Sequence, residues 1–188
     1  RMLRLALYSR DCLRQLRDET SISYQAQQKG ILHFYRNPKD LHKNKIRAQR
    51  MAELGCPFLA LSPTEVAAIE PALDKVRSQI FGGLYYPEDE SGDAYVFTQN
   101  LTDLCKNQGV EFMFGTNITA LATKRDNLTG IETDKGMLSA DAVVLALGSY
   151  CPALTRPLGL KLPIQPVKGY SITLQVTPDQ SAPEISLI

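Results

Sequence analysis

Residues 142–150 read AVVLALGSY, and this stretch decides the predicted fold. Its first six residues are apolar without alternation, a pattern typical of a strand buried on both faces of a parallel α/β sheet. Gly148 then places backbone without a Cβ at the carboxyl edge, where open α/β sheets bind their ligands. Ser149 is placed to cap a short helix that Pro152 allows. The residues alone leave open the alternative that Gly148 only turns the chain.

The residues upstream of this run add antiparallel elements. Three short β-prone runs predict a meander, over residues 118–124, 129–134 and 137–139. Before them, Asp93 is placed to cap a helix that Gly109 ends, and residues 110–114 alternate like a strand. Helix, strand, meander and buried strand together predict a mixed α/β fold class.

The first half of the chain predicts further helices. They run over residues 3–18, from Asn37 to about Leu54, and from Ser62 to just before Pro71. Asn37 precedes a proline at the first helical position, and Gly55 closes the same helix. Ser62 and Glu65 have the spacing of a capping box.

Strands are predicted between these helices and near the end of the chain. Residues 22–36 suggest a hairpin broken at Lys29-Gly30, and residues 80–86 a strand interrupted by Gly82-Gly83. A third strand, over residues 170–176, follows Gly169. Beside Lys168 and Tyr170, this glycine either lets a ligand approach the backbone or forms a bulge.

Composition excludes several classes of function. The 188 residues include 21 Lys and Arg against 20 Asp and Glu, so no electrostatic footprint for nucleic acid is present. Four separated cysteines and two histidines encode neither a zinc site nor a redox pair, which indicates reduced thiols in a reducing compartment. The acidic run 88–93 fails the spacing of a calcium-binding loop, and a solvated turn before a capped helix is expected. We expect no metal site and no nucleic-acid partner.

The spacing of the glycines argues against a dinucleotide-binding diphosphate loop within this sequence. None of the twelve glycines forms a Gly-x-Gly-x-x-Gly fingerprint after an apolar strand, and the residues after Gly82-Gly83 cannot open a helix. The chain is also short for a complete dinucleotide-dependent oxidoreductase. A Rossmann-like domain is therefore expected to place its diphosphate loop upstream of Arg1.

Several short motifs of the sequence resemble those of one enzyme family. They are residues 82–98 (GGLYYPEDESGDAYVFT), 143–150 (VVLALGSY), 157–159 (PLG) and 166–171 (PVKGYS), with YSRDCL at 8–13 and EPAL at 70–73. In this order they resemble the small-subunit family of bacterial D-amino-acid dehydrogenases, within the D-amino-acid oxidase-like FAD superfamily. The similarity spans nearly the whole chain.

The resemblance implies an FAD enzyme that oxidises D-amino acids to imino acids, which hydrolyse to 2-oxo acids and ammonia. Electrons would pass to a quinone-type acceptor of the respiratory chain, from a cytoplasmic enzyme with peripheral contact to the inner membrane. Ile118 would lie against the adenine side of FAD. The backbone of Ala146, Leu147 and Gly148 would line the cofactor, with Ser149 and Tyr150 beside it.

Further assignments complete what the resemblance implies. Lys168, Gly169 and Tyr170 would lie where the cofactor and substrate domains meet, and no catalytic residue is assigned. The domain assignment is a helix bordering the FAD domain (1–19), a substrate-domain portion with a mixed sheet (20–90), part of a Rossmann-like FAD domain with the meander (91–150), and a return to the substrate domain (151–188). The chain is then an internal portion of its parent that binds FAD weakly or not at all by itself.

Two alternatives stay open at this point. One is a sarcosine- or glycine-oxidase-like amine oxidase of the same superfamily. The other is a non-enzymatic binding domain that shares the scaffold, because fold alone does not fix function.

Overall fold

The computed structural model describes residues 2–125, 127–177 and 182–188, which form two compact units. Unit 1 combines Arg1–Val110 with Gln175–Ile188, and unit 2 is Glu111–Leu174. Each unit contains helices and a sheet of its own, so the predicted mixed α/β class is confirmed.

The helices of unit 1 lie where the sequence predicted them, with one exception. These are α1 (Met2–Thr20), α2 (Pro38–Ala52), α3 (Pro63–Ile69), the 3-10 helix η1 (Pro71–Gln79) and α4 (Ala94–Asn107). The Asn37 side chain accepts a hydrogen bond from the Lys39 amide at 2.8 Å, and Asp93 accepts one from Val96 at 2.9 Å. The capping box of Ser62 and Glu65 is present in both directions. Helix η1 was not predicted.

The sheet of unit 1 has the order β2-β3-β1-β7, formed by Leu59–Leu61, Gly82–Tyr86, Ile31–Tyr35 and Ser186–Leu187. Strand β3 pairs antiparallel with both β1 and β2, and β7 pairs parallel with β1. The predicted hairpin over residues 22–36 is wrong. Its first half instead lies against residues 91–93, where Gln27 bridges Ser91 and the Asp93 amide donates to the Tyr24 carbonyl.

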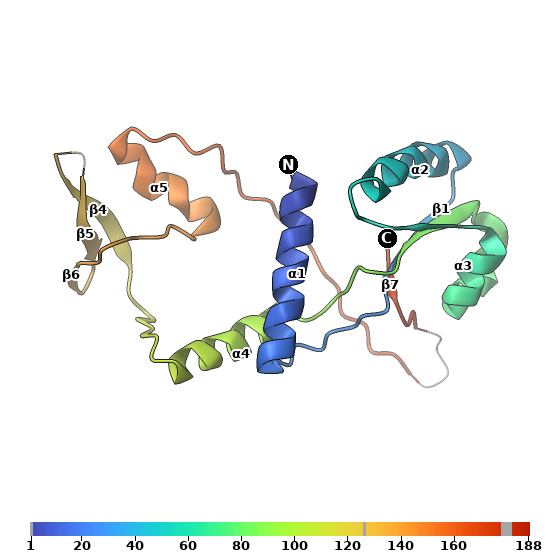
Figure 1. Ribbon diagram of the computed structural model, residues 1–188, viewed down its shortest axis with the longest axis horizontal. Helices are drawn as coiled ribbons and strands as arrows, with labels where there is room; N and C mark the ends of the chain where they lie inside the picture. Colours follow the sequence, from blue (N-terminus) through green and yellow to red (C-terminus); the bar gives the residue numbers. More distant parts are fainter. Residues whose placement is uncertain (1, 126, 178–181) are drawn as a thin grey trace. The chain divides into compact units, whose positions relative to one another are not determined.

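Helices cover both faces of this sheet (Figure 1). Leu32 of β1 packs with Val66 of α3 on one face, and Leu84 of β3 packs with Ala48 of α2 on the other. Gly83 lets α3 approach closely, since a Cβ there would stand 2.8 Å from the Val66 side chain. The two glycines therefore do not interrupt the strand, as the sequence suggested, but make the packing possible.

A buried carboxylate fixes strand β7. Glu70 is only 1% exposed, and its oxygens accept hydrogen bonds from the amides of Ala72, Glu184 and Ile185. The first of these bonds caps η1, and the other two hold the residues just before β7. One side chain thus joins segments more than 110 residues apart in sequence.

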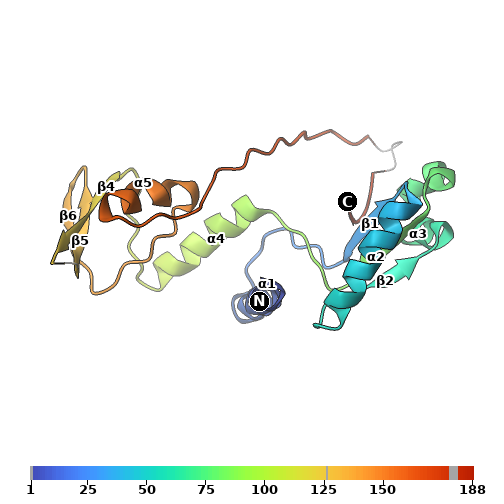
Figure 2. The same ribbon diagram turned by 90° about the horizontal axis from the view of Figure 1, so that it is seen from above.

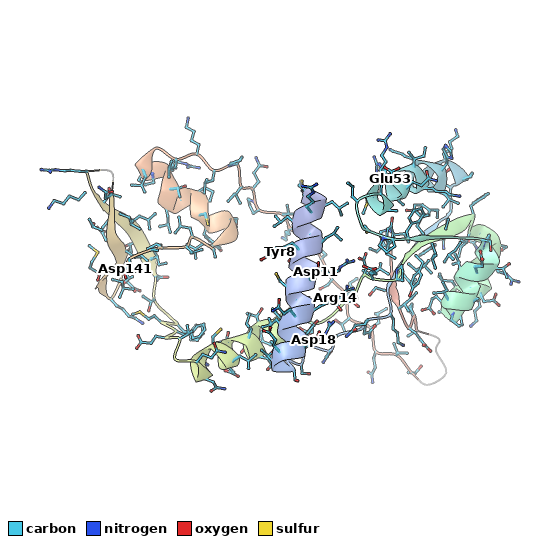
Figure 3. All side chains as sticks on the ribbon, viewed as in Figure 1. Tyr8, Asp11, Arg14, Asp18, Glu53 and Asp141 are labelled. Carbon is cyan, nitrogen blue, oxygen red and sulfur yellow. The ribbon has the colours of Figure 1, made fainter. Side chains whose placement is uncertain are left out.

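The acidic turn after β3 is not simply solvated, as the sequence suggested. Arg10 of α1 pairs with Glu88 at 2.8 Å, and Arg17 pairs with Glu90 at 2.7 Å. Arg14, which extends from the same helix (Figure 3), donates to the Glu88 carbonyl at 2.8 Å. The three arginines lie at positions i, i+4 and i+7, so one face of α1 holds the turn. The hydrogen bond to Glu90 raises the pKa of the Arg17 guanidinium above its usual value.

Unit 2 is built on the predicted meander. Strands β4 (Ile118–Lys124), β5 (Asn127–Thr133) and β6 (Gly136–Leu138) pair antiparallel in that order. Helix α5 (Cys151–Thr155) lies against β4 (Figure 2), between the 3-10 turns η2 (Gly148–Tyr150) and η3 (Arg156–Leu158). Pro152 lies in the first turn of α5, as predicted.

Three predicted strands do not form among the described residues. Residues 110–114, 142–147 and 170–176 have no strand assignment. Val144 is 88% exposed, and the rings of Phe112 and Phe114 stack on each other at 5.4 Å. An apolar run becomes a buried strand only when neighbouring strands bond its edges and other elements cover its faces. The described part of the chain supplies neither to these runs.

Candidate functional site

An open cavity of about 310 Å³ lies within unit 2, between the start of β4 and the α5 region. It is lined by Thr116, Asn117, Ile118, Leu147, Tyr150, Ala153 and Leu154. Three of these, Ile118, Leu147 and Tyr150, are residues that the sequence assigned to the cofactor side. They come from segments about thirty residues apart in sequence, and the fold brings them to one place.

Hydrogen bonds to one aspartate fix the wall at the start of β4. The Asn117 amide donates to Asp134 Oδ1 at 3.1 Å, and the Asn117 side chain donates to Oδ2 at 3.3 Å. The Asp134 amide returns a bond to the Asn117 carbonyl at 3.0 Å. Because three bonds hold Asn117, the neighbouring Ile118 side chain stands in a defined position at the cavity wall.

The opposite wall of the cavity depends on a tight turn that follows the apolar run 142–147. Asp141 directly precedes this run (Figure 3). Gly148 has φ +53°, a left-handed conformation that favours glycine, and a Cβ there would meet no atom within 4 Å. The Tyr150 amide donates to the Leu147 carbonyl at 3.1 Å and closes the turn. Gly148 therefore does turn the chain, and the open space beside it leaves its backbone accessible to a ligand.

Ser149 does not act as the predicted helix cap. No side chain caps η2 or α5, and the residue at the N-cap of α5 is Tyr150. Ser149 instead lies inside the 3-10 turn η2, one residue before the N-cap position of α5. Ala146, Gly148 and Ser149 adjoin the cavity in sequence but do not line it.

The remaining predicted residues lie apart from the cavity. Lys168, Gly169 and Tyr170 are exposed and lie outside any helix or strand. The Lys168 ammonium lies 5.2 Å from the centre of the Tyr170 ring, which is a cation–π interaction.

Sequence reasoning missed four lining residues, Thr116, Asn117, Ala153 and Leu154. Asn117 directly precedes the predicted strand that begins at Ile118, and this adjacency was a usable signal. Ala153 and Leu154 reach the cavity only because α5 packs on β4, which no local pattern encodes.

The titratable groups whose pKa burial shifts belong to unit 1, whereas the cavity belongs to unit 2. Burial lowers the pKa of His33, whose ring lies edge-on to Tyr86 at 5.2 Å. Burial also raises the pKa of the Tyr86 phenol and of the Cys56 thiol. Cys56 is therefore protonated at neutral pH and is a poor nucleophile.

The described part of the chain contains neither a metal-binding cluster nor a helix that could span a membrane. Among residues 2–125, 127–177 and 182–188, no group of three or more His, Cys, Asp or Glu side chains is placed to hold a metal ion. None of the described helices combines the length and the apolar character needed to cross a membrane.

Two solved structures illustrate the fold that this chain shares with known proteins. L-proline dehydrogenase from P. horikoshii matches with a TM-score of 0.73 and 20% identity, over 82% of this chain and 40% of that one. Glycine oxidase from Bacillus cereus matches with a TM-score of 0.71 and 24% identity, over 82% and 43%. At these identities the likeness shows the fold.

Sequence comparison identifies the family. Residues 1–187 match the FAD dependent oxidoreductase family, and the chain belongs to it. D-amino acid dehydrogenase of Methylobacterium radiotolerans is 50% identical over 97% of this chain and 44% of its own length. The enzyme of the same name from Vibrio cholerae is 42% identical over 100% and 45%. The chain thus spans less than half the length of these relatives.

The cavity fits part of the cofactor that gives the family its name. Ile118, Leu147 and Tyr150 offer the apolar and aromatic surfaces that a flat ring system contacts, and the space beside Gly148 admits a ligand to the backbone. The lining would suit a ring portion of FAD, and the sequence offers no glycine loop that would hold its phosphates.

Proposed function

We propose that the protein carrying this chain is an FAD-dependent dehydrogenase that converts D-amino acids to 2-oxo acids and ammonia. Family membership and 42–50% identity to D-amino acid dehydrogenases support this function. The structural observation that carries it is the cavity that gathers Ile118, Leu147 and Tyr150. When bound, FAD supplies the two-electron acceptor for substrate oxidation.

The proposal extends to the electron acceptor and the location of the enzyme. Relatives named as dehydrogenases support an acceptor other than oxygen, and we assign a quinone-type acceptor of the respiratory chain. The enzyme then works in the cytoplasm and contacts the inner-membrane surface where such quinones reside.

Each predicted site residue has a role in this proposal. Ile118 lies against the adenine side of FAD, and the backbone of Ala146, Leu147 and Gly148 lines the cofactor. Ser149 and Tyr150 stand beside it. Residues 168–170 lie where the cofactor and substrate domains meet. Residues 91–150 belong to the FAD domain, and helix 1–19 borders that domain. Residues 20–90 and 151–188 belong to the substrate domain.

Two glycines make a matched test of the cofactor site. Gly148 (φ +53°) and Gly115 (φ +62°) both adopt left-handed conformations, and a Cβ at either would meet nothing within 4 Å. Replacement by alanine therefore imposes similar backbone strain of about 1 kcal/mol at both positions. In a protein of the relatives' full length, we expect Gly148→Ala to lower the ratio of bound flavin to protein several-fold. Gly115→Ala should leave that ratio near wild type.

The measurements are flavin absorbance per polypeptide and the reduction of a quinone analogue with a panel of D-amino acids. Equal flavin content in the two variants would contradict the assignment of Gly148. Turnover of sarcosine or glycine with oxygen, and none with D-amino acids, would identify an amine oxidase instead. A full-length protein without flavin and without turnover would identify a binding domain.

A further inference from the structure

Strand β4 contains one extra residue at the end that borders the cavity. Ile118 stands opposite Thr133 of β5, and Ala120 stands opposite Glu132, so Thr119 has no residue of its own opposite it. This is a β-bulge, a feature that often re-aims a side chain next to a functional site. Residues directly opposite share a face of the sheet, and neighbours on one strand do not. Ile118 and Ala120 therefore stand on different faces, although they are two positions apart.

The bulge decides which face of the sheet Ile118 occupies. A second open cavity is lined by Thr123 of β4 together with Pro157, Leu158 and Leu160, so the Thr123 side of β4 faces the segment of α5 and η3 (Figure 2). In a regular strand Ile118 would lie on the other side, because five positions separate it from Thr123. Ile118 instead lines the cavity with Ala153 of α5. The bulge thus turns this side chain toward α5.

The turn between β5 and β6 holds the bulged end of β4. The Asp134 carboxylate accepts hydrogen bonds from both the backbone amide and the side-chain amide of Asn117. The next residue of the turn, Lys135, donates from its ammonium to the Thr116 hydroxyl at 3.1 Å. Two successive turn residues thus fix the two residues that precede Ile118, and Thr116 and Asn117 line the cavity as well.

We propose that Asp134 is a positioning residue of the cofactor site, which keeps Ile118 against the adenine portion of FAD. This inference rests on the proposed function, in which the cavity receives that part of the cofactor. Asp134 is not among the residues that line the cavity, so it acts through Asn117 and the bulge. Without its carboxylate the Asn117 amide loses its acceptor. The end of β4 can then shift in register, and a one-residue shift turns a side chain to the opposite face.

Three variants of a protein of the relatives' full length test this role. Asp134→Ala removes the acceptor, whereas Asp134→Asn keeps a side-chain oxygen that can accept from the Asn117 amide. Glu132→Ala is the matched control, because Glu132 is an exposed acid on the same strand that stands opposite Ala120, on the face away from Ile118. The measurement is the dissociation constant of FAD, from the quenching of flavin fluorescence as FAD is added to flavin-free protein.

We expect Asp134→Ala to raise this dissociation constant roughly three- to tenfold, the range for the loss of one hydrogen bond. Asp134→Asn and Glu132→Ala should both bind FAD like the wild type. Rescue by asparagine identifies the acceptor oxygen as the feature that matters. An Asp134→Asn variant as weak as Asp134→Ala would overturn the proposal, because the backbone bond would then not be what positions Ile118.

Amide hydrogen exchange on the 188-residue chain provides a readout that needs no flavin. The amide of Asn117 should exchange several-fold faster in Asp134→Ala than in wild type or Glu132→Ala. Unchanged exchange would overturn the positioning role. Equal FAD affinity in Asp134→Ala and Glu132→Ala would overturn this inference alone. A full-length wild-type protein that binds no FAD would overturn the proposed function together with it.

Discussion

Strands β1 and β3 of unit 1 contain completely buried leucines, whereas the apolar run 142–147 of unit 2, which is entirely aliphatic, is largely exposed. Leu32 and Leu84 are completely buried, because each strand has bonded neighbours and helices on both faces. Val144 is 88% exposed, and no strand pairs with its run among the described residues. An apolar run therefore specifies the need for partners, and only the remainder of the fold supplies them.

The same contrast separates stability from function in this chain. Unit 1 contains the core, the buried Glu70 and the arginine contacts of α1. Unit 2 contains the cavity that we propose for the cofactor. Three of the residues that line it are exposed, namely Ile118, Leu147 and Tyr150. We infer that substitutions in unit 1 change the free energy of unfolding, while those around the cavity change ligand binding.

The largest effect is expected from truncating the core. Leu84→Ala leaves a cavity beneath α2 and should lower the free energy of unfolding by roughly 2–5 kcal/mol. Val144→Ala removes exposed apolar atoms and should change it by less than about 0.5 kcal/mol. Urea denaturation of the two variants measures both values. Similar losses would mean that the run at 142–147 is buried like β3.

A smaller loss in the free energy of unfolding is expected when the buried side chain of Glu70 is removed. Glu70→Ala leaves three backbone amides without their acceptor and should cost about 2 kcal/mol. Amide hydrogen exchange should accelerate selectively at Glu184 and Ile185. As a control, Glu184→Gln removes only an exposed 3.6 Å ion pair with Lys29 and should have little effect. Unchanged exchange at residues 184–185 in Glu70→Ala would show that β7 is held by other contacts.

Loss of a helix cap is the next effect in size. Asp93→Ala removes the acceptor for the Val96 amide and should cost about 1 kcal/mol in thermal or urea unfolding. Asp103→Ala on the exposed face of the same helix breaks only a pair with Lys106 and should cost a few tenths of that. Equal costs would indicate that the N-terminus of α4 is capped in another way.

The smallest effect concerns pH. Burial lowers the pKa of His33 in the folded chain below its usual value of about 6.5, against an opposing attraction from Asp89. The unfolded chain then binds more protons than the folded one as pH falls through 6.5, so the free energy of unfolding should decrease toward lower pH. His33→Phe keeps an aromatic ring beside Tyr86 and should flatten that decline. A decline that is equally steep in the variant would assign it to other groups.

Local features of the fold were predictable from sequence and distant pairings were not. Asn37, Ser62 and Asp93 cap helices through bonds that span two or three residues, so their spacing alone reveals them. The pairing of β1 with β3 joins residues about fifty positions apart, and no local pattern distinguishes it from a hairpin. For this reason the predicted hairpin at 22–36 was wrong.

The candidate site divides in the same way. Ile118 and Leu147 lie next to elements that the sequence marks clearly, a strand start and a strand-end glycine. Ala153 and Leu154 enter the cavity through the packing of α5 on β4, and no sequence signal specified that contact. Lys168 and Tyr170 were assigned by resemblance, and their link to the cofactor remains a proposal.

Native-state amide hydrogen exchange on the 188-residue chain tests most directly the claim that unit 1 is completed within the chain and the apolar run of unit 2 is not. We predict that the amides of β1 and β3 exchange slowly, with protection close to that of global unfolding. The amides of residues 142–147 should exchange near the rate of an unstructured peptide. Comparable protection in the two regions would contradict the account, because it would mean that the run before Gly148 is already part of a formed sheet.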